Sequence, residues 1–212
     1  MTYKLYYDLA SASQGVQAVL EEIGAPYELI QSTKDRDKPR PSEQLAINPN
    51  GWLPVLIWGD NAMYECAAIT VFLCDRHPEA NLAPKFDEPE RGLYLQTLVY
   101  FSNSVQNAFQ LSYYPDRFAE TPDDEPSAQR RGIRRLRETW KVIDDQIGDN
   151  EWVLGERFSS ADIYLFMLTT WLRSSLGHPS TDEFPNVKRI AGAVLSRPSI
   201  QLVYAKWIAE RG

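Results

Sequence analysis

The pair Glu65-Cys66 stands at the start of a helical pattern, and the chemistry of that position suits an anion. The first residues of a helix leave backbone N–H groups without partners in the helix, and the helix dipole places partial positive charge there. Carboxylate and phosphate groups bind readily at such an end. A redox role for Cys66 is the less favoured alternative, which rests on the low pKa of thiols at helix N-termini in general.

The two cysteines and two histidines do not suggest a metal site or a catalytic triad. Cys66 and Cys74 lie eight residues apart and form no CxxC motif. His77 and His178 each precede a proline, so we expect both at helix ends or in loops. These residues do not have the spacing of zinc ligands. We therefore expect no metal and no histidine-based triad.

The charge balance disfavours nucleic acid as a partner. The chain has 212 residues and a formal net charge of −7, which would repel a phosphate backbone. Five arginines form one basic cluster, for which we expect a solvated helix face: Arg130, Arg131, Arg134, Arg135 and Arg137. The sequence has no apolar run of about 18 residues and no leader pattern at its start, so we expect a cytoplasmic protein that does not enter a membrane.

The first part of the chain alternates strand and helix patterns. We expect strands at 3–7, 27–30, 54–58 and 63–65, and helices at 14–23, 42–47 and 66–76. Gly24 follows the first helix, and Gly59 to Asn61 separate two short apolar runs as in a hairpin. The order βαβαββα predicts a mixed sheet with helices packed on it, because a strand–helix–strand crossover pairs strands in parallel and a hairpin adds antiparallel ones.

The second part carries helical periodicity alone. Helices are expected at 91–112, 129–147, 159–175, 187–196 and 200–209. The stretch between the two parts contains prolines and no periodicity. The expected organisation is therefore an α/β domain over 1–78, a linker over 79–87 and an all-helical domain over 88–212.

Two separate motifs resemble the glutathione S-transferase superfamily. One is NPNGWLPVL at 48–56 followed by YECAAI at 64–69, and the other is GERFSSAD at 155–162. In the second motif Ser159 can cap a helix that begins at Ser160, while Asp162 reaches back to the backbone N–H of Ser159. The resemblance implies a thioredoxin-like first domain, a helical second domain, glutathione as co-substrate, and a cytosolic, bacterial-like member with a serine-type active site.

The first motif implies a glutathione site. By resemblance, Leu53 precedes a cis-proline, Pro54, and offers its backbone N–H and C=O to the cysteinyl unit of glutathione. The N–H of Cys66 would bind the γ-glutamyl carboxylate, and Glu65 would pair with the ammonium group of the same unit. Cys66 stands where the family usually has Ser or Thr, so we expect its backbone N–H to make the main contact.

Trp52 is a second departure from the family pattern, after Cys66. Many members have Lys or Gln at this position, so a salt link to the glycyl carboxylate is lost here. Lys38 or Arg40 could replace it, although exposed loop charges are the simpler interpretation of both residues. Trp52 itself remains among the residues expected at the site.

Glutathione transfer requires a thiolate, and the resemblance implies a hydroxyl that stabilises it. Ser11 is our choice, because it falls where several serine-type classes place this hydroxyl. Ser13, Tyr6 and Tyr7 stay open as alternatives, with Ser13 also able to cap the following helix. Cysteine-type chemistry is not expected, because the bacterial class with a catalytic cysteine has it at position 12, where this chain has Ala12.

The expected function is conjugation of glutathione to a small apolar electrophile by a homodimeric detoxification enzyme. The second substrate should face Phe101, Ser104 and Tyr113 of the helical part. The alternatives are a glutathione-dependent isomerase of the zeta type, a non-catalytic interaction protein with this fold, and a thioredoxin-like oxidoreductase. The last two are disfavoured by the retained site residues and by the missing CxxC motif, respectively.

Overall fold

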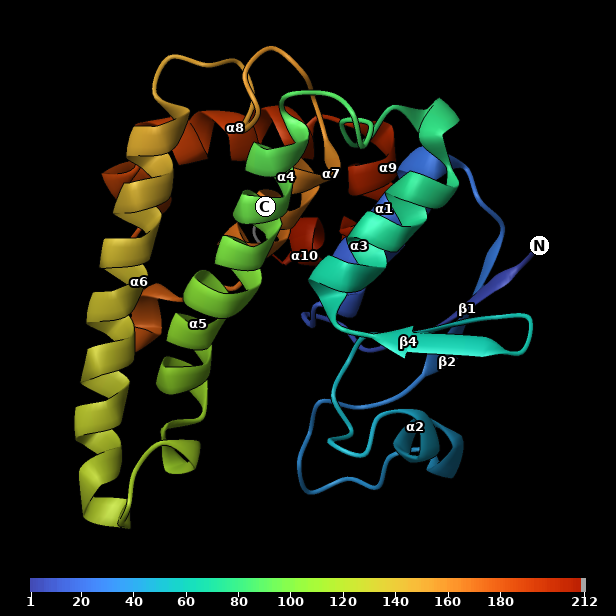
Figure 1. Cartoon of the computed structure of the whole chain (residues 1–212). Coiled ribbons are helices and arrows are strands. Elements are labelled where there is room, and N and C mark those ends of the chain that lie inside the picture. Colours follow the sequence, from blue (N-terminus) through green and yellow to red (C-terminus); the bar gives the residue numbers. More distant parts are fainter. Residues whose placement is uncertain (211–212) are drawn as a thin grey trace. The chain divides into compact units, whose positions relative to one another are not determined.

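The computed structural model describes residues 1–210. Their contacts divide them into two compact units (Figure 1). The sheet unit comprises Met1–Glu88 together with the described residues from Leu195 onward, and the helical unit comprises Pro89–Val194. The sequence assigns the C-terminal residues to the helical domain, whereas their contacts group them with the sheet. The limits 1–78 and 88–212 stay a prediction.

The sheet unit has the expected order βαβαββα. Its elements are β1 (Tyr3–Tyr7), α1 (Ser13–Ile23), β2 (Tyr27–Gln31), α2 (Ser42–Ile47), β3 (Val55–Trp58), β4 (Asn61–Tyr64) and α3 (Cys66–Arg76). The strands lie in the order β2-β1-β3-β4. The β1 and β2 strands are parallel, and the other two pairings are antiparallel. The predicted mixed sheet is thereby confirmed.

Burial of apolar side chains holds α1 and α3 in place, and Figure 1 shows the two helices side by side. The apolar face of α1 includes Val16 and Leu20, and that of α3 includes Ile69 and Leu73, all of which are fully buried. Gly24 ends α1 in the left-handed conformation, with φ of 72°, which a residue without Cβ adopts at little cost. The predicted end of this helix is therefore confirmed.

The C-terminal helices α9 (Pro198–Val203) and α10 (Ala205–Ala209) belong to the sheet unit. The helix α9 packs on α1, where Arg197 binds the Glu22 carboxylate through Nε and Nη2, each at 2.7 Å. Burial raises the pKa of Glu22, but hydrogen bonds from Arg197 and Ser199 outweigh it and hold this pKa below its ordinary value. A bidentate pair of this kind fixes the position of α9 on α1.

The helical unit contains α4 (Arg91–Tyr100), a π-helical turn (Phe101–Val105), α5 (Gln106–Tyr113), α6 (Glu125–Ile147), α7 (Ser160–Thr169) and α8 (Pro185–Leu195), whose last residue falls in the sheet unit. Short 3₁₀ turns lie at Pro115–Arg117, Pro122–Asp124, Ser174–Leu176 and Thr181–Glu183, and a further one, Pro78–Ala80, follows α3 in the sheet unit. The periodicity predicts one helix over 91–112, and the structure interrupts it with the π-helical turn. Among residues 1–210 no helix combines the length and the apolarity that crossing a membrane requires.

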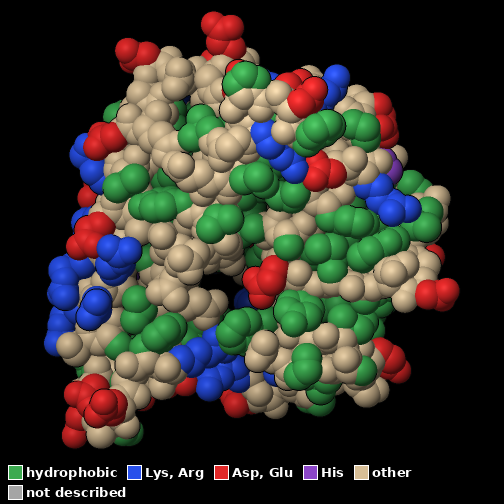
Figure 2. All heavy atoms as spheres, viewed as in Figure 1, with side chains coloured by type: hydrophobic (Ala, Val, Ile, Leu, Met, Phe, Trp, Pro, Cys, Tyr) green, Lys and Arg blue, Asp and Glu red, His purple; other side chains and the backbone are tan. Residues whose placement is uncertain are grey.

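The α5 and α6 helices run side by side (Figure 1), and their backbones approach closely at Gly132. A Cβ atom at Gly132 would lie only 2.7 Å from the backbone nitrogen of Ser112, so this position needs glycine. On the other side of α6, all five clustered arginines are exposed, and Figure 2 shows basic side chains along this helix. Arg135 and Arg137 pair with Glu138 and Glu183. The arginine cluster is thus a solvated helix face.

The capping box predicted at Ser159 is present at the start of α7. Ser159 Oγ accepts a hydrogen bond from Ala161 N, and Asp162 Oδ2 accepts one from Ser159 N at 2.8 Å. Asp162 Oδ1 also accepts from Val153 N at 2.9 Å, a contact that sequence spacing does not reveal. Every residue of α7 is buried, so the box orients a helix that lies wholly inside the core of the unit.

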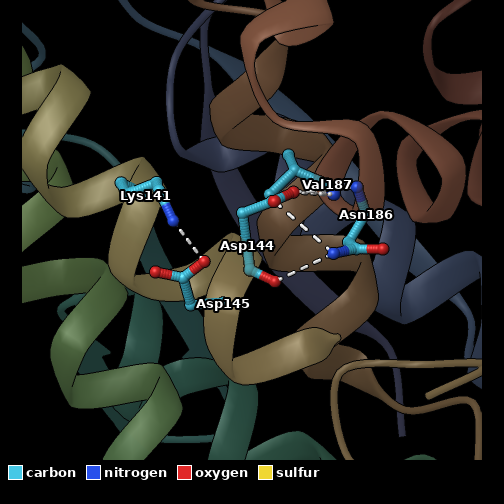
Figure 3. Close-up of polar contacts among 5 residues, drawn as sticks. All are labelled: Lys141, Asp144, Asp145, Asn186 and Val187. Atoms are coloured by element: carbon cyan, nitrogen blue, oxygen red, sulfur yellow. Dashed lines mark hydrogen bonds and ion pairs between the residues drawn. The ribbon is translucent and has the colours of Figure 1, made fainter. Parts of the chain in front are cut away.

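The start of α8 is capped from a distance by Asp144 of α6 (Figure 3). Asp144 Oδ1 accepts hydrogen bonds from Asn186 N at 2.8 Å and Val187 N at 3.0 Å, two of the N–H groups that a helix start leaves without partners. The neighbouring Asp145 instead pairs with Lys141 on the exposed side of α6. Asp144 therefore caps a helix from a buried position, whereas its neighbour Asp145 forms an ion pair on the surface.

Replacing Asp144 by alanine should lower the free energy of unfolding by about 1–3 kcal/mol, because the buried N–H of Val187 and the partly buried N–H of Asn186 lose their acceptor. Asp145→Ala is the matched control and should cost less than about 0.5–1 kcal/mol, since it removes only an exposed ion pair. Denaturant unfolding of both variants measures the difference. Equal losses would show that Asp144 does not stabilise the start of α8.

Candidate active site

The loop before β3 is held by buried amide side chains. The peptide bond between Leu53 and Pro54 is cis, as the resemblance implies. Just before it, the carbonyl of Trp52 accepts hydrogen bonds from Asn48 Nδ2 at 3.2 Å and Gln44 Nε2 at 3.5 Å. Gln44 is fully buried, and its own carbonyl accepts from Ser32 Oγ. Leu53 therefore follows a loop residue whose carbonyl is held by two side-chain amides. Nothing in the local sequence pattern indicates this role for Gln44.

The α3 helix begins at Cys66, and Glu65 precedes it in an unusual backbone conformation. Glu65 has φ of 76° and ψ of 111°, a region that residues with a side chain rarely adopt. Strained backbone of this kind occurs preferentially at functional sites. The Glu65 side chain is exposed, whereas Cys66 is buried, with its Sγ donating to the Ala12 carbonyl at 3.5 Å.

The turn between β1 and α1 gathers the candidate hydroxyl groups. Ser11 Oγ lies 2.6 Å from Ser13 Oγ and donates to the Asp8 carbonyl at 2.8 Å. Asp8 N donates to Ser13 Oγ at 3.2 Å. The α1 helix begins at Ser13 itself, after Ala12, which makes no side-chain cap. The expectation that Ser13 caps this helix is therefore wrong, because its hydroxyl faces Asp8.

Two further contacts shape this turn. Ala10 has φ of 53°, and its N–H donates to Gln14 Oε1 at 2.6 Å. Gln14 is buried and also donates through Nε2 to the Val203 carbonyl in α9 at 3.4 Å. The turn that carries Ser11 thus depends on a side chain of α1 and on the C-terminal helices, and the sequence pattern indicates neither contact.

The tyrosines near the turn remain protonated at neutral pH. Burial raises the pKa of Tyr6, and the Glu43 carboxylate raises it further. Burial and then the Asp8 carboxylate have the same effect on the pKa of Tyr7. Tyr204, between α9 and α10, is fully buried, and desolvation raises its pKa well above the ordinary value. Tyr6 and Tyr7 would therefore stabilise a sulfur anion only as neutral hydrogen-bond donors, as a serine hydroxyl would.

The two cations considered for the glycyl carboxylate differ in their surroundings. Lys38 is exposed and pairs with Asp35 at 3.4 Å. Arg40 lies against the loop before β3, where its Nε donates to the Gly51 carbonyl at 2.7 Å. Trp52, the next residue, is 50% exposed. Arg40 is therefore the better-positioned of the two for a ligand beside Trp52.

The three residues of the helical unit that were predicted to contact the second substrate differ in their burial. Phe101 and Ser104 lie in the π-helical turn, and Tyr113 ends α5. Phe101 is fully buried and stacks on Tyr164 with ring centroids 5.7 Å apart, so it belongs to the core and offers no surface to a substrate. Ser104 is half-buried, as is Tyr113, whose hydroxyl donates to the Trp171 carbonyl at 2.5 Å.

The histidines occupy the expected kinds of position. His77 follows the last residue of α3, and His178 lies in a loop. His178 is buried, with Nε2 2.7 Å from Ser112 Oγ, and burial lowers its pKa. Over residues 1–210, no three His, Cys, Asp or Glu side chains come together in a way that could hold a metal ion.

Comparison with known families identifies this architecture. The family model for the N-terminal domain of glutathione S-transferases matches residues 5–81, and the model for the C-terminal domain matches residues 64–198. The chain therefore belongs to the glutathione S-transferase superfamily. Its sheet unit has the thioredoxin-like fold of that superfamily.

Individual relatives agree with this assignment at modest identity. Glutathione S-transferase GstA of Escherichia coli O157:H7 is 27% identical over 173 residues, which cover 79% of this chain and 81% of that protein. The probable glutathione S-transferase GSTF2 of Oryza sativa subsp. japonica is 28% identical over 191 residues, covering 88% and 87%.

Solved structures agree with the fold. A glutathione transferase homologue from Sulfitobacter with bound glutathione superposes with a TM-score of 0.86 at 24% identity, covering 97% of this chain and 98% of that one. A family member from Pseudomonas fluorescens Pf-5 with two glutathione molecules bound has a TM-score of 0.78 at 26% identity, covering 95% and 91%.

Proposed function

We propose that this protein is a glutathione transferase that conjugates the thiolate of glutathione to a small apolar electrophile. One observation carries the proposal: Cys66 Sγ lies 3.5 Å from the Ala12 carbonyl. Ser11 precedes Ala12 and Glu65 precedes Cys66, so this contact joins the turn with the candidate thiol-activating hydroxyl to the helix start expected to bind the γ-glutamyl unit. The bound glutathione in two solved relatives supports the same ligand here.

Each part of glutathione has a proposed partner in the sheet unit. The backbone of Leu53 before Pro54 would pair with the cysteinyl unit as an added strand does. The N–H of Cys66 would hold the γ-glutamyl carboxylate at the positive end of α3, and Glu65 would pair with the ammonium group. Ser11 would donate to the sulfur, and Trp52 would lie beside the glycyl unit, with Arg40 as the nearby cation.

The partners beyond glutathione are also proposals. Ser104 and Tyr113 are the remaining candidates for contact with the electrophile, and the aromatic content of the helical unit favours an apolar one. We further propose a cytoplasmic homodimer that acts in detoxification. A panel of electrophiles offered with glutathione tests the activity. Turnover of a dicarboxylate isomer alone would instead identify an isomerase, and retention on a glutathione column with no turnover would indicate a binding protein.

Glu65→Gln should weaken glutathione binding by about ten- to a hundredfold, because the ammonium group of the ligand loses its charged partner. The fold should remain intact, since the Glu65 side chain is exposed. Calorimetric titration with glutathione measures the affinity. Glu28→Gln, an exposed change of the same kind on β2, is the control and should bind normally. Unchanged affinity in Glu65→Gln would place the γ-glutamyl unit elsewhere.

A further inference from the structure

We infer that Ser13 is a positioning residue for Ser11: its hydroxyl donates to Ser11 Oγ and leaves the Ser11 proton free to point at the glutathione sulfur. The inference rests on the proposed function and deepens it. Ser13 does not touch the ligand in this arrangement, because it is fully buried. Its effect is transmitted through one oxygen–oxygen contact of 2.6 Å.

The other hydrogen bonds of the pair favour one direction for this contact, in which either hydroxyl could donate. Ser13 Oγ accepts from Asp8 N at 3.2 Å, and Ser11 Oγ accepts from Ser13 N at 3.2 Å. Each hydroxyl has a single proton to donate. The proton of Ser11 has an acceptor in the Asp8 carbonyl at 2.8 Å, which leaves the short contact between the hydroxyls to the proton of Ser13.

The alternative acceptor for Ser13 is less well placed. Ser13 Oγ lies 3.2 Å from the Asp8 carbonyl, which is longer than both its contact with Ser11 and the Ser11 bond to the same carbonyl. The favoured network therefore runs from Asp8 N–H to Ser13 Oγ and from the Ser13 hydroxyl to Ser11 Oγ. A hydroxyl that accepts hydrogen bonds becomes a stronger donor, because chains of hydrogen bonds polarise one another.

The network also explains how Ser11 can change partner when glutathione binds. Without ligand, the Ser11 proton rests on the Asp8 carbonyl, a neutral acceptor. A thiolate is an anion, and hydrogen bonds to ions are roughly twice as strong as those between neutral groups. The Ser11 proton then turns to the sulfur, while Ser13 and its N–H keep Ser11 Oγ in place. No covalent bond changes, and no proton leaves either serine.

The test is the pKa of the glutathione thiol bound to the enzyme, measured from thiolate absorbance against pH. Ser13→Ala should raise this pKa by about half a unit, so that turnover at neutral pH falls about threefold and recovers in alkali. Ser13→Cys keeps the connectivity of the side chain but replaces the hydroxyl with a larger group that donates weakly, and should behave like Ser13→Ala. The double variant Ser11→Ala/Ser13→Ala should match Ser11→Ala alone, because Ser13 acts only through Ser11.

A merely structural role for Ser13 predicts a different result. It would lower stability and leave the pKa of the bound thiol in place, as expected for Thr139→Val, which removes a buried hydroxyl from the helical unit. If Ser13→Ala leaves the pKa of the bound thiol unchanged while Ser11→Ala raises it, the inference about Ser13 is wrong but the proposed function stands. Additive effects in the double variant would have the same meaning. Wild-type protein that binds no glutathione would overturn the proposed function itself.

Discussion

Ser11→Ala is expected to raise the pKa of enzyme-bound glutathione by about one to two units and to lower turnover at neutral pH about ten- to a hundredfold. A hydrogen bond to a charged group is worth about 1.5–3 kcal/mol, and one pKa unit corresponds to about 1.4 kcal/mol. Only the thiolate reacts, so the loss should recover partly in alkali, where the thiol ionises without help. Glutathione affinity should change less than turnover, because the other proposed contacts remain.

The pH dependence of thiolate absorbance and of conjugation rate measures this effect. Tyr6→Phe is a suitable control, since the Tyr6 side chain is buried and its pKa is raised. Ser13→Ala cannot serve as a neutral control, because its hydroxyl lies 2.6 Å from that of Ser11. If Tyr6→Phe shifts both curves and Ser11→Ala shifts neither, the thiol is activated by Tyr6.

Asp162→Ala is expected to lower the free energy of unfolding by about 2–4 kcal/mol with little change in glutathione affinity. A helix cap alone is worth about 0.5–2 kcal/mol. The Asp162 carboxylate also accepts from the buried N–H of Val153, and a buried donor without an acceptor costs about 1–3 kcal/mol. Denaturant midpoints and calorimetric titration measure the two properties. A fully stable variant would show that the capping box does not stabilise α7.

The contribution of Asp162 to the stability of the protein should decrease as the pH rises. Burial raises the pKa of Asp162 from 3.8 to about 6, because desolvation outweighs the hydrogen bonds from Val153 and Ser159, which lower it. Between these values the folded protein holds a proton that the unfolded chain has released. Stability contributed by this group therefore decreases as pH rises from about 4 to about 6.

Asp162→Asn isolates this effect, because asparagine has nearly the same shape and does not titrate. The stability difference between wild type and Asp162→Asn should be larger at pH 5 than at pH 8, by about 1–2 kcal/mol. Thr139→Val, which removes a buried hydroxyl that does not titrate, is the control and should show no such trend. A difference that stays the same between pH 5 and pH 8 would mean that Asp162 is ionised throughout this range.

Local sequence patterns were sufficient to predict most of the secondary structure. Strand β1, helix α2 and helix α3 begin and end where periodicity and turn residues place them, because each depends on neighbouring side chains and on local backbone preferences. The capping box of Ser159 and Asp162 was predictable for the same reason, since its partners lie three residues apart. Two motifs were enough to indicate the superfamily.

Contacts between residues distant in sequence decided the rest. The turn that brings Ser11 to Ser13 depends on Gln14, which is held by Val203 from the other end of the chain. The cap of α8 comes from Asp144, some forty residues earlier. Phe101, which we expected in the second-substrate pocket, is instead buried against Tyr164. Sequence periodicity shows which face of a helix or strand is apolar, but it does not show which other element packs against that face. The tertiary structure decides this packing, and the packing determines which polar groups come into contact.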